Sequence, residues 1–156
     1  MHANRLFYNA GTADGIDMAQ FDYVLDCIDT VSAKLLLIER CKAAGTPILC
    51  SMGAANKLDP TAFRVADIEK TSVDPLAKVI RIQCRKRRLG KVKVVFSTEV
   101  PLPPLTEELD ESPANGRRTV PASNAFVPAA CGLVCGSEAV KDLLRKAGTY
   151  RAESDR

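Results

Sequence analysis

Two short apolar stretches separated by one helical pattern constrain the fold most strongly. Residues 21–28 ("FDYVLDCI") and 46–52 ("TPILCSM") have the length and apolar content of buried strands. Residues 30–45 repeat apolar side chains at helical spacing and end at Gly45, a residue typical of a helix C-terminus. Because short connections join the three elements, they are predicted to form a right-handed crossover whose two strands lie parallel in one sheet.

The rest of the chain extends this unit into a single α/β domain over residues 1–156. Further strands are predicted at 64–69 and 91–98, and further helices at 74–88 and 126–147. Residues 1–20 are expected to be a connecting segment, and residues 100–124, with five of the nine prolines, a long loop. No charged residue occurs between Phe126 and Gly136, so the first half of the last helix is expected to be buried on all sides.

Composition excludes several classes of protein. With 46% apolar and 26% charged residues, the chain is an ordinary globular sequence rather than a disordered one. No apolar run approaches the ~20 residues of a membrane span, and no secretory signal is present, so a cytoplasmic protein with reduced cysteines and no membrane contact is expected. The absence of a C-x-x-C pair and the single histidine, His2, argue against most zinc sites and histidine-based triads.

An aspartate follows the first predicted strand, at the edge of the sheet where parallel α/β proteins bind ligands. Asp29 is placed to hold Mg²⁺ against the phosphates of a nucleotide. Alternatively, Asp29 or Thr30 caps the following helix, and spacing alone favours the cap. Asp26 lies inside the strand and is expected to be a buried, paired structural residue.

The loop after the second strand falls at the same edge. Gly53 permits close backbone approach, while Asn56 and Lys57 offer donors to an anion; the alternative is an ordinary polar loop. Cys50 is the thiol nearest to this loop, and a nucleophilic role would require a lowered pKa. Cys131 and Cys135 share one helix face, where close packing is favoured over a redox or metal pair.

A dense group of cations surrounds the end of the helix predicted at 74–88. Its six members lie within nine residues: Arg85, Lys86, Arg87, Arg88, Lys91 and Lys93. Lysine and arginine are favoured at helix C-termini by the dipole, so a solvated helix end is one interpretation. The density of charge favours contact with RNA or DNA, although no aromatic residue is interleaved to stack on bases.

Several stretches together resemble a known family. They are "FDYVLDCIDTVSAKLLLIERCKAAGTPILCSMGAANKLDPTAFRVADIEKTSVDPLAKVIR", "KVVFSTEVP" and "FVPAACGLVCGSEAVKDL". They are similar to tRNA threonylcarbamoyladenosine dehydratases, members of the ThiF-type adenylating superfamily that includes ubiquitin-activating enzymes. The aspartates at a strand end, the "GAxNKLDP" loop and "TSVDPLA" recur in the same order, and the likeness covers nearly the whole chain.

The resemblance implies a Rossmann-like, mainly parallel sheet with flanking helices, and it makes Asp29 the acidic residue that binds Mg²⁺ and ATP. The implied reaction uses ATP to activate the carboxylate of the threonylcarbamoyl group on a tRNA adenosine. Intramolecular attack then closes a ring with loss of AMP. The basic cluster would hold tRNA, and the family implies a homodimer and a sulfurtransferase partner.

The sequence also departs from the family pattern. Family members begin with a Gly-rich ATP loop and further ribose- and phosphate-binding residues, which would precede Met1. The resemblance therefore implies the C-terminal part of an N-terminally incomplete enzyme, not competent alone. The loop reads "GAAN" where members often have "GAGN", so Ala55 crowds backbone approach. Two alternatives are an adenylating enzyme for a ubiquitin-like sulfur carrier, many of which hold zinc through C-x-x-C pairs, and a non-catalytic remnant that binds RNA or dimerises.

Overall fold

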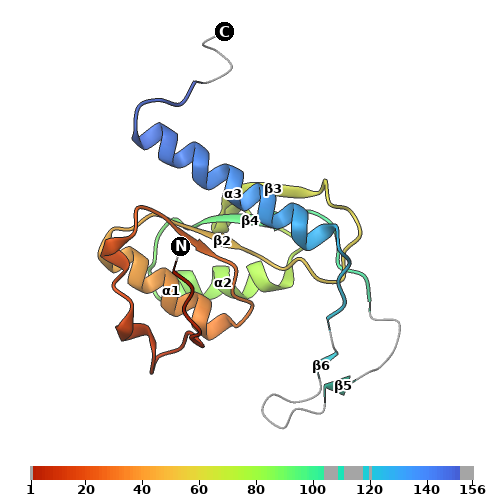
Figure 1. The fold of residues 1–156 in the computed structure, drawn as a ribbon. Coiled ribbons are helices and arrows are strands. Elements are labelled where there is room, and N and C mark those ends of the chain that lie inside the picture. Colours follow the sequence, from red (N-terminus) through yellow and green to blue (C-terminus); the bar gives the residue numbers. More distant parts are fainter. Residues whose placement is uncertain (1, 104–108, 111–117, 120, 152–156) are drawn as a thin grey trace.

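The computed structural model describes residues 2–103, 109–110, 118–119 and 121–151. The helices are α1 (Val31–Ala44), α2 (Pro75–Lys86) and α3 (Val127–Lys146), with short 3-10 turns at Ala13–Gly15, Met18–Gln20 and Ile68–Lys70. The strands are β1 (Val24–Asp26), β2 (Ile48–Ser51), β3 (Phe63–Asp67), β4 (Lys93–Ser97), β5 (Leu109–Asp110) and β6 (Arg118–Thr119). They form three layers, with α1 and α2 on one face of the main sheet and α3 on the other (Figure 1).

The main sheet has the strand order β1-β2-β4-β3. β1 pairs with β2 and β2 pairs with β4 in parallel, whereas β3 runs antiparallel to β4. The predicted α/β class with a mainly parallel sheet is confirmed, and the weakly patterned stretch after residue 63 forms the reversed strand. The carboxyl ends of β1, β2 and β4 therefore meet at one edge, which sets where a ligand would approach.

Successive residues of the central strands supply the two halves of the core. Cys50 and Val94 face α1 and α2, where they join a cluster that includes Ile38. Leu49 and Val95 face α3. Because both faces of β2 and β4 are covered, these strands are apolar without interruption, as is typical of parallel sheets.

The helices begin and end where the sequence predicts, within two residues. Gly45 ends α1 in the left-handed region, with φ 71°. The carboxylate of Asp74 accepts the Ala77 amide at 2.8 Å and caps α2, with Pro75 in the first turn. α2 stops at Lys86 because Arg88 takes a left-handed φ of 55°.

The first strand is shorter than the predicted 21–28. It ends at Asp26 because the carboxylate of that residue accepts the Ile28 amide at 3.0 Å and turns the backbone. The third strand runs from Phe63 to Asp67, whose side chain then caps a 3-10 turn by accepting the Glu69 amide.

The expectation that the first half of α3 is buried on all sides is wrong. Val127, Cys131 and Cys135 do pack on the sheet. On the opposite side, Phe126 is 71% and Leu133 75% exposed. The missing charges therefore mark a second apolar face rather than complete burial.

The N-terminal segment packs onto α1, with Ala13 and Met18 buried and the Thr46 hydroxyl donating to the Met18 carbonyl at 2.8 Å. Most of the loop predicted at 100–124 lies outside the described residues; within it, β5 and β6 pair antiparallel. None of the described helices has the length and apolar content to cross a membrane.

Candidate functional site

A buried ion pair fixes the carboxyl end of β1. The Lys34 ammonium donates to the Asp26 carboxylate at 2.7 Å, and both side chains are fully buried. The same ammonium donates to the Ser51 carbonyl at 2.9 Å and so ties β1, α1 and β2 together. The predicted structural role of Asp26 is confirmed, and the burial of Lys34 explains how a carboxylate is tolerated inside the sheet.

Asp29 lies just beyond this pair and is exposed. Among the described residues its carboxylate is hydrogen-bonded to the Thr30 hydroxyl at 3.3 Å. Thr30 is the N-cap residue of α1, but its side chain forms no capping bond. Asp29 and Thr30 line a depression of about 510 Å³ together with Arg87 from the end of α2. The carboxylate is thus available to an added cation.

Lys57 is engaged inside the protein. Its ammonium donates to the Asp74 carboxylate at 2.7 Å and to the Gly53 carbonyl, with both charged side chains buried. A Cβ at Gly53 would lie 3.2 Å from the same carboxylate, so the loop and the start of α2 need a glycine to approach this closely. The structure thus places Gly53 and Lys57 in a loop-to-helix contact rather than around the depression at Asp29.

Asn56 joins the two ends of the connection that follows β4. Its amide donates to the Ala122 carbonyl at 2.7 Å, its side-chain oxygen accepts the Ala122 amide at 2.9 Å, and its carbonyl accepts the Leu102 amide at 2.7 Å. Asn56 adopts φ 57°, a region that asparagine tolerates better than most residues. Its polar groups therefore hold residues 102 and 122 side by side.

Two thiols lie against the end of β2 from the α3 side. Cys131 Sγ is 3.2 Å from Ser51 Oγ. Hydrogen bonds from Cys135 and Ser51 and the positive charge of Lys57 lower the pKa of Cys131 to about 7 despite burial. The hydrogen bond with Cys131 raises the pKa of Cys135. Both residues are buried in the core, as predicted for close packing.

Cys50 is fully buried between β2 and the α1–α2 layer. Burial, followed by the negative charge of Asp26, raises its pKa well above the ordinary value of a thiol. Cys50 therefore lacks the lowered pKa that nucleophilic chemistry would require. All six cysteines are free thiols in the structure.

The basic cluster divides into paired and unpaired members. Arg85 pairs with Glu69, Arg87 with Glu39, and Lys93 with Asp142. No described acid pairs with the remaining three members, which are exposed: Lys86, Arg88 and Lys91. The six cations therefore do not form one continuous unpaired surface.

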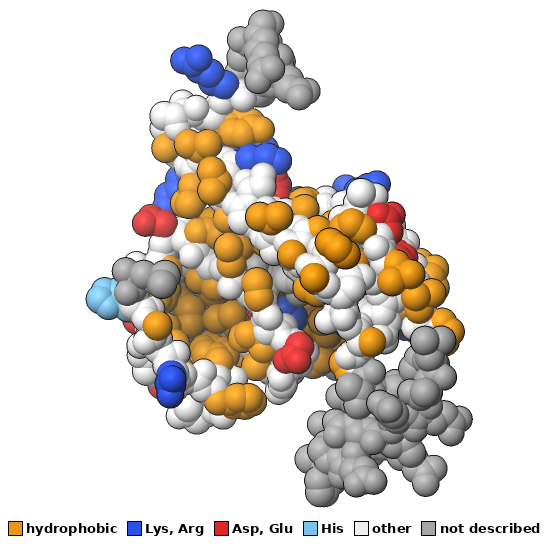
Figure 2. Space-filling model, turned by 45° about the vertical axis from the view of Figure 1, so that its right-hand side comes forward, with side chains coloured by type: hydrophobic (Ala, Val, Ile, Leu, Met, Phe, Trp, Pro, Cys, Tyr) orange, Lys and Arg blue, Asp and Glu red, His pale blue; other side chains and the backbone are white. Residues whose placement is uncertain are grey.

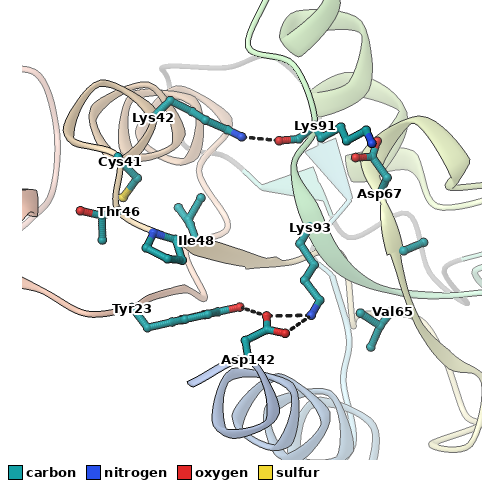
Figure 3. Close-up of a pocket in the computed structure, with 13 residues that line it drawn as sticks. Tyr23, Cys41, Lys42, Thr46, Ile48, Val65, Asp67, Lys91, Lys93 and Asp142 are labelled. Atoms are coloured by element: carbon teal, nitrogen blue, oxygen red, sulfur yellow. Dashed lines mark hydrogen bonds and ion pairs between the residues drawn. The ribbon is translucent and has the colours of Figure 1, made fainter. Parts of the chain in front are cut away.

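Lys93 points toward the α3 side, into a cavity of about 650 Å³ at the opposite, amino edge of the parallel strands. Figure 3 shows Tyr23 and Lys93 both directed at Asp142. The Tyr23 hydroxyl and the Lys93 ammonium donate to the Asp142 carboxylate at 2.8 and 2.7 Å. Although burial opposes it, the hydrogen bonds from Lys93 and Tyr23 lower the pKa of Asp142. Burial and the bond to Asp142 raise the pKa of Tyr23. These satisfied charges indicate a structural contact between α3 and the sheet.

The sequence reasoning missed Lys34 and Ser51. Lys34 lies in the first turn of α1 between apolar residues. A cation at a core-facing position could have been matched to Asp26, the acid that the sequence places inside the preceding strand. Nothing in the sequence distinguishes Ser51 from other polar residues at strand ends.

The strand order, the helices on both faces and the polar groups at the carboxyl edge define a Rossmann-like α/β protein. No protein-family model matches the chain. It is 42% identical over 150 residues to the tRNA threonylcarbamoyladenosine dehydratase of Bacillus subtilis and 33% identical over 143 residues to that of Escherichia coli. The crystal structure of the E. coli tRNA N6-threonylcarbamoyladenosine dehydratase in complex with AMP superimposes with a TM-score of 0.76 at 29% identity.

These matches cover 92% of this chain for the B. subtilis relative and for the E. coli structure. In turn the chain spans 59% of the first and 57% of the second, little more than half their length. Over nearly its whole length the chain is similar to tRNA threonylcarbamoyladenosine dehydratases, and its sheet is of the ThiF-like Rossmann type.

Proposed function

We propose that this chain forms the acid-bearing part of an enzyme that uses ATP to cyclise the threonylcarbamoyl group on a tRNA adenosine. The observation that carries the proposal is the exposed Asp29 carboxylate at the carboxyl edge of a sheet similar to that of the AMP-bound E. coli structure. In the proposed reaction the threonylcarbamoyl carboxylate attacks the α-phosphorus of ATP and releases pyrophosphate. Attack on the adenylated carboxyl group from within the same substituent closes the ring and releases AMP.

At the carboxyl edge of the sheet, the position of Asp29 suits a divalent cation. Asp29 offers carboxylate oxygens that no described basic side chain neutralises, and oxygen ligands are those that Mg²⁺ prefers. Bound Mg²⁺ would offset the negative charge of the ATP phosphates. Thr30 adds a hydroxyl beside the carboxylate.

Gly53, Asn56 and Lys57 are proposed to contribute by fixing the conformation of the loop at the carboxyl edge of the sheet. The Lys57 ammonium is buried and paired with Asp74, and the Asn56 backbone and side-chain oxygen are bonded to residues 102 and 122, so Lys57 offers no free cation to phosphate in this arrangement. The sequence contains no Gly-rich phosphate loop. This chain alone is therefore expected to bind ATP weakly, and tight Mg²⁺-dependent binding in a calorimetric titration would contradict that.

The substrate and partners follow from the same proposal. We expect tRNA to contact the exposed cations at the end of α2, a homodimer, a sulfurtransferase partner and a cytoplasmic location. Of these, tRNA has the strongest support, because the relatives are named for acting on it.

The test adds the part of the enzyme that this chain does not cover. The chain is combined with the remaining portion of the B. subtilis relative, and AMP release is measured with ATP, Mg²⁺ and threonylcarbamoylated tRNA. AMP release by the pair is expected, and Asp29→Asn should reduce it at least tenfold, because the amide keeps the shape but loses the charge. An inactive, well-folded pair would instead favour the non-catalytic alternative.

A matched control distinguishes the loss of the Asp29 charge from the loss of any other exposed negative charge. Asp22 has an 85% exposed side chain next to β1, and Asp22→Asn should leave AMP release unchanged. Both variants should melt within about 2 °C of the wild type, since neither residue is buried and neither caps a helix. If Asp29→Asn released AMP normally, the proposed role of Asp29 would be wrong.

A further inference from the structure

Asp26 and Lys34 differ from most charged residues of the chain because both of their side chains are fully buried. Charged side chains normally lie on a protein surface, and Figure 2 shows several of them exposed on one face of this molecule. Replacing a buried ion pair by apolar residues of similar volume is often neutral for stability or even favourable. The fold alone therefore gives no reason for a charged pair at the end of β1.

The two oxygens of the Asp26 carboxylate have different partners. One oxygen accepts the Lys34 ammonium at 2.7 Å, and the other accepts the Ile28 amide at 3.0 Å. The Ile28 amide belongs to the segment that leaves β1, so this bond fixes the direction in which the chain turns. Because Lys34 holds the other oxygen, the carboxylate stays in the orientation that accepts the Ile28 amide.

Lys34 also holds the far end of the same segment. Its backbone amide donates to the Thr30 carbonyl at 2.9 Å, which is the first hydrogen bond of α1. Its ammonium donates to the Ser51 carbonyl at 2.9 Å, at the end of β2. Residues 27–30 are thus fixed at both ends, by the Asp26 carboxylate at Ile28 and by Lys34 at Thr30.

Asp29 lies inside this fixed segment. Its carboxylate is exposed, and among the described residues its hydrogen-bond partner is the Thr30 hydroxyl at 3.3 Å. Groups that bind a metal work best when other, firmly held residues fix their orientation. Here the backbone on both sides of Asp29 is held by buried groups, while its side chain remains available to a ligand.

We propose that Asp26 is a positioning residue, which orients the Asp29 carboxylate toward a divalent cation through its bond to the Ile28 amide, and that Lys34 holds Asp26 in place. This inference rests on the proposed role of Asp29. Neither Asp26 nor Lys34 would touch the cation, since both are buried. Without the bond the segment has more conformations open to it, and affinity falls in proportion to the fraction that remains competent to bind.

Two double variants separate the bond from the charge. Asp26→Val with Lys34→Met removes the ion pair and the acceptor of the Ile28 amide, without leaving one charge buried alone. Asp26→Asn with Lys34→Met also removes both charges, but its amide oxygen can still accept the Ile28 amide. Asp26→Ala with Lys34→Met removes the same acceptor with a smaller side chain and serves if the valine variant does not fold. Tyr23→Phe is the control at the opposite end of β1, where it removes the bond to Asp142.

Manganese titration of the isotope-labelled full chain, followed by nuclear magnetic resonance, measures the site without catalysis. Mn²⁺ prefers the same oxygen ligands as Mg²⁺, and its unpaired electrons broaden the signals of nearby amides. Half-broadening of the Asp29 and Thr30 amide signals should need about fivefold more Mn²⁺ in the valine double variant than in the wild type. The asparagine double variant should restore the wild-type value to within about twofold, and Tyr23→Phe should not change it. Hydrogen exchange at the Ile28 amide should accelerate in the valine variant alone.

The same variants are then combined with the remaining portion of the B. subtilis relative. The valine double variant should need about tenfold more Mg²⁺ for half-maximal AMP release, with a similar maximal rate at saturating Mg²⁺, because the fully loaded site is the same. A general loss of structure would instead lower the maximal rate at every Mg²⁺ concentration.

Equal Mn²⁺ requirements in the wild type and the valine double variant, at unchanged circular dichroism, would overturn the positioning role and leave the proposed role of Asp29 intact. Equal losses in the valine and asparagine double variants would assign the effect to the buried charges and overturn the role of the bond. If Mn²⁺ did not broaden the Asp29 signal of the wild type, or if broadening survived Asp29→Asn, the proposed role of Asp29 would itself be wrong and this inference would fall with it.

Discussion

Lys57 and Asp74 form an ion pair of 2.7 Å in which both side chains are buried, and this contact joins the loop after β2 to the first turn of α2. The Asp74 carboxylate also caps α2, and the Lys57 ammonium also holds the Gly53 carbonyl. One pair thus fixes a helix start and a loop at the edge where the candidate site lies. Stability, rather than anion binding, is the property most sensitive to Lys57.

Replacing Lys57 by methionine should destabilise the chain by about 3–5 kcal/mol, because the Asp74 charge would remain buried without its partner. Urea denaturation gives the free energy of unfolding directly. Lys146→Met is the control: its pair with Asp22 is mostly exposed and should contribute no more than about 1 kcal/mol. A loss below about 1 kcal/mol for Lys57→Met would show that the buried pair is not needed for the fold.

Glycine and alanine substitutions separate the two roles of Asn56, which are its left-handed backbone and its hydrogen bond to the Ala122 amide. Asn56→Gly keeps the left-handed backbone but loses the bond to the Ala122 amide, a cost of about 0.5–1.5 kcal/mol. Asn56→Ala loses the bond and adds about 1–2 kcal/mol of backbone strain. The expected order of unfolding free energies is therefore wild type, then Asn56→Gly, then Asn56→Ala. Hydrogen exchange at the Ala122 amide should accelerate in both variants, and an unchanged rate would remove the proposed link between this loop and residue 122.

The lowered pKa of Cys131 predicts a pH-dependent stability. Its folded pKa is about 7 against an ordinary value of 9.0, so the unfolded chain binds more protons between these values. Stability from this group is therefore present above pH 9 and is lost as the pH falls toward 7, with a slope of at most about 1.4 kcal/mol per pH unit.

Cys131→Ser should remove this slope between pH 7 and 9. Cys84→Ser is the matched control, because Cys84 is an equally buried thiol whose pKa is raised by burial, so it contributes no stability that increases with pH. Urea midpoints at pH 7, 8 and 9 give the comparison. Parallel pH profiles for wild type and Cys131→Ser would mean that Cys131 does not ionise in this range.

The order of elements could be read from the sequence because it depends on local signals. Apolar spacing, the Asp74 cap and the Gly45 stop each act within a few residues. The burial of Lys57 could not be read from the sequence, because its partner Asp74 lies 17 residues further along the chain. The exposed face of α3 was missed because an uncharged helix segment has the same composition whether both of its faces are buried or only one.

The division of the basic cluster also has a physical reason. Side chains along a strand alternate between faces, so Lys93 is directed to the α3 side, whereas Arg85 and Arg87 project from the end of α2 on the other side of the sheet. The acids that pair with them, Glu69 and Glu39, come from other elements. A count of cations along the sequence therefore overstates the charge available to a partner.

The unpaired cations Lys86, Arg88 and Lys91 are expected to make the contacts with tRNA phosphates. Replacing all three by glutamine should reduce the slope of log affinity against log salt by roughly 0.7 to 0.9 for each lost contact. Arg85→Gln with Arg87→Gln is the comparison: these side chains are held by Glu69 and Glu39, so the double variant should change the slope by less per residue. Filter binding of tRNA over a salt series, with circular dichroism to check the fold, gives both slopes. Equal slopes for the triple variant and the wild type would assign these cations to a solvated helix end, as the helix dipole alone would favour.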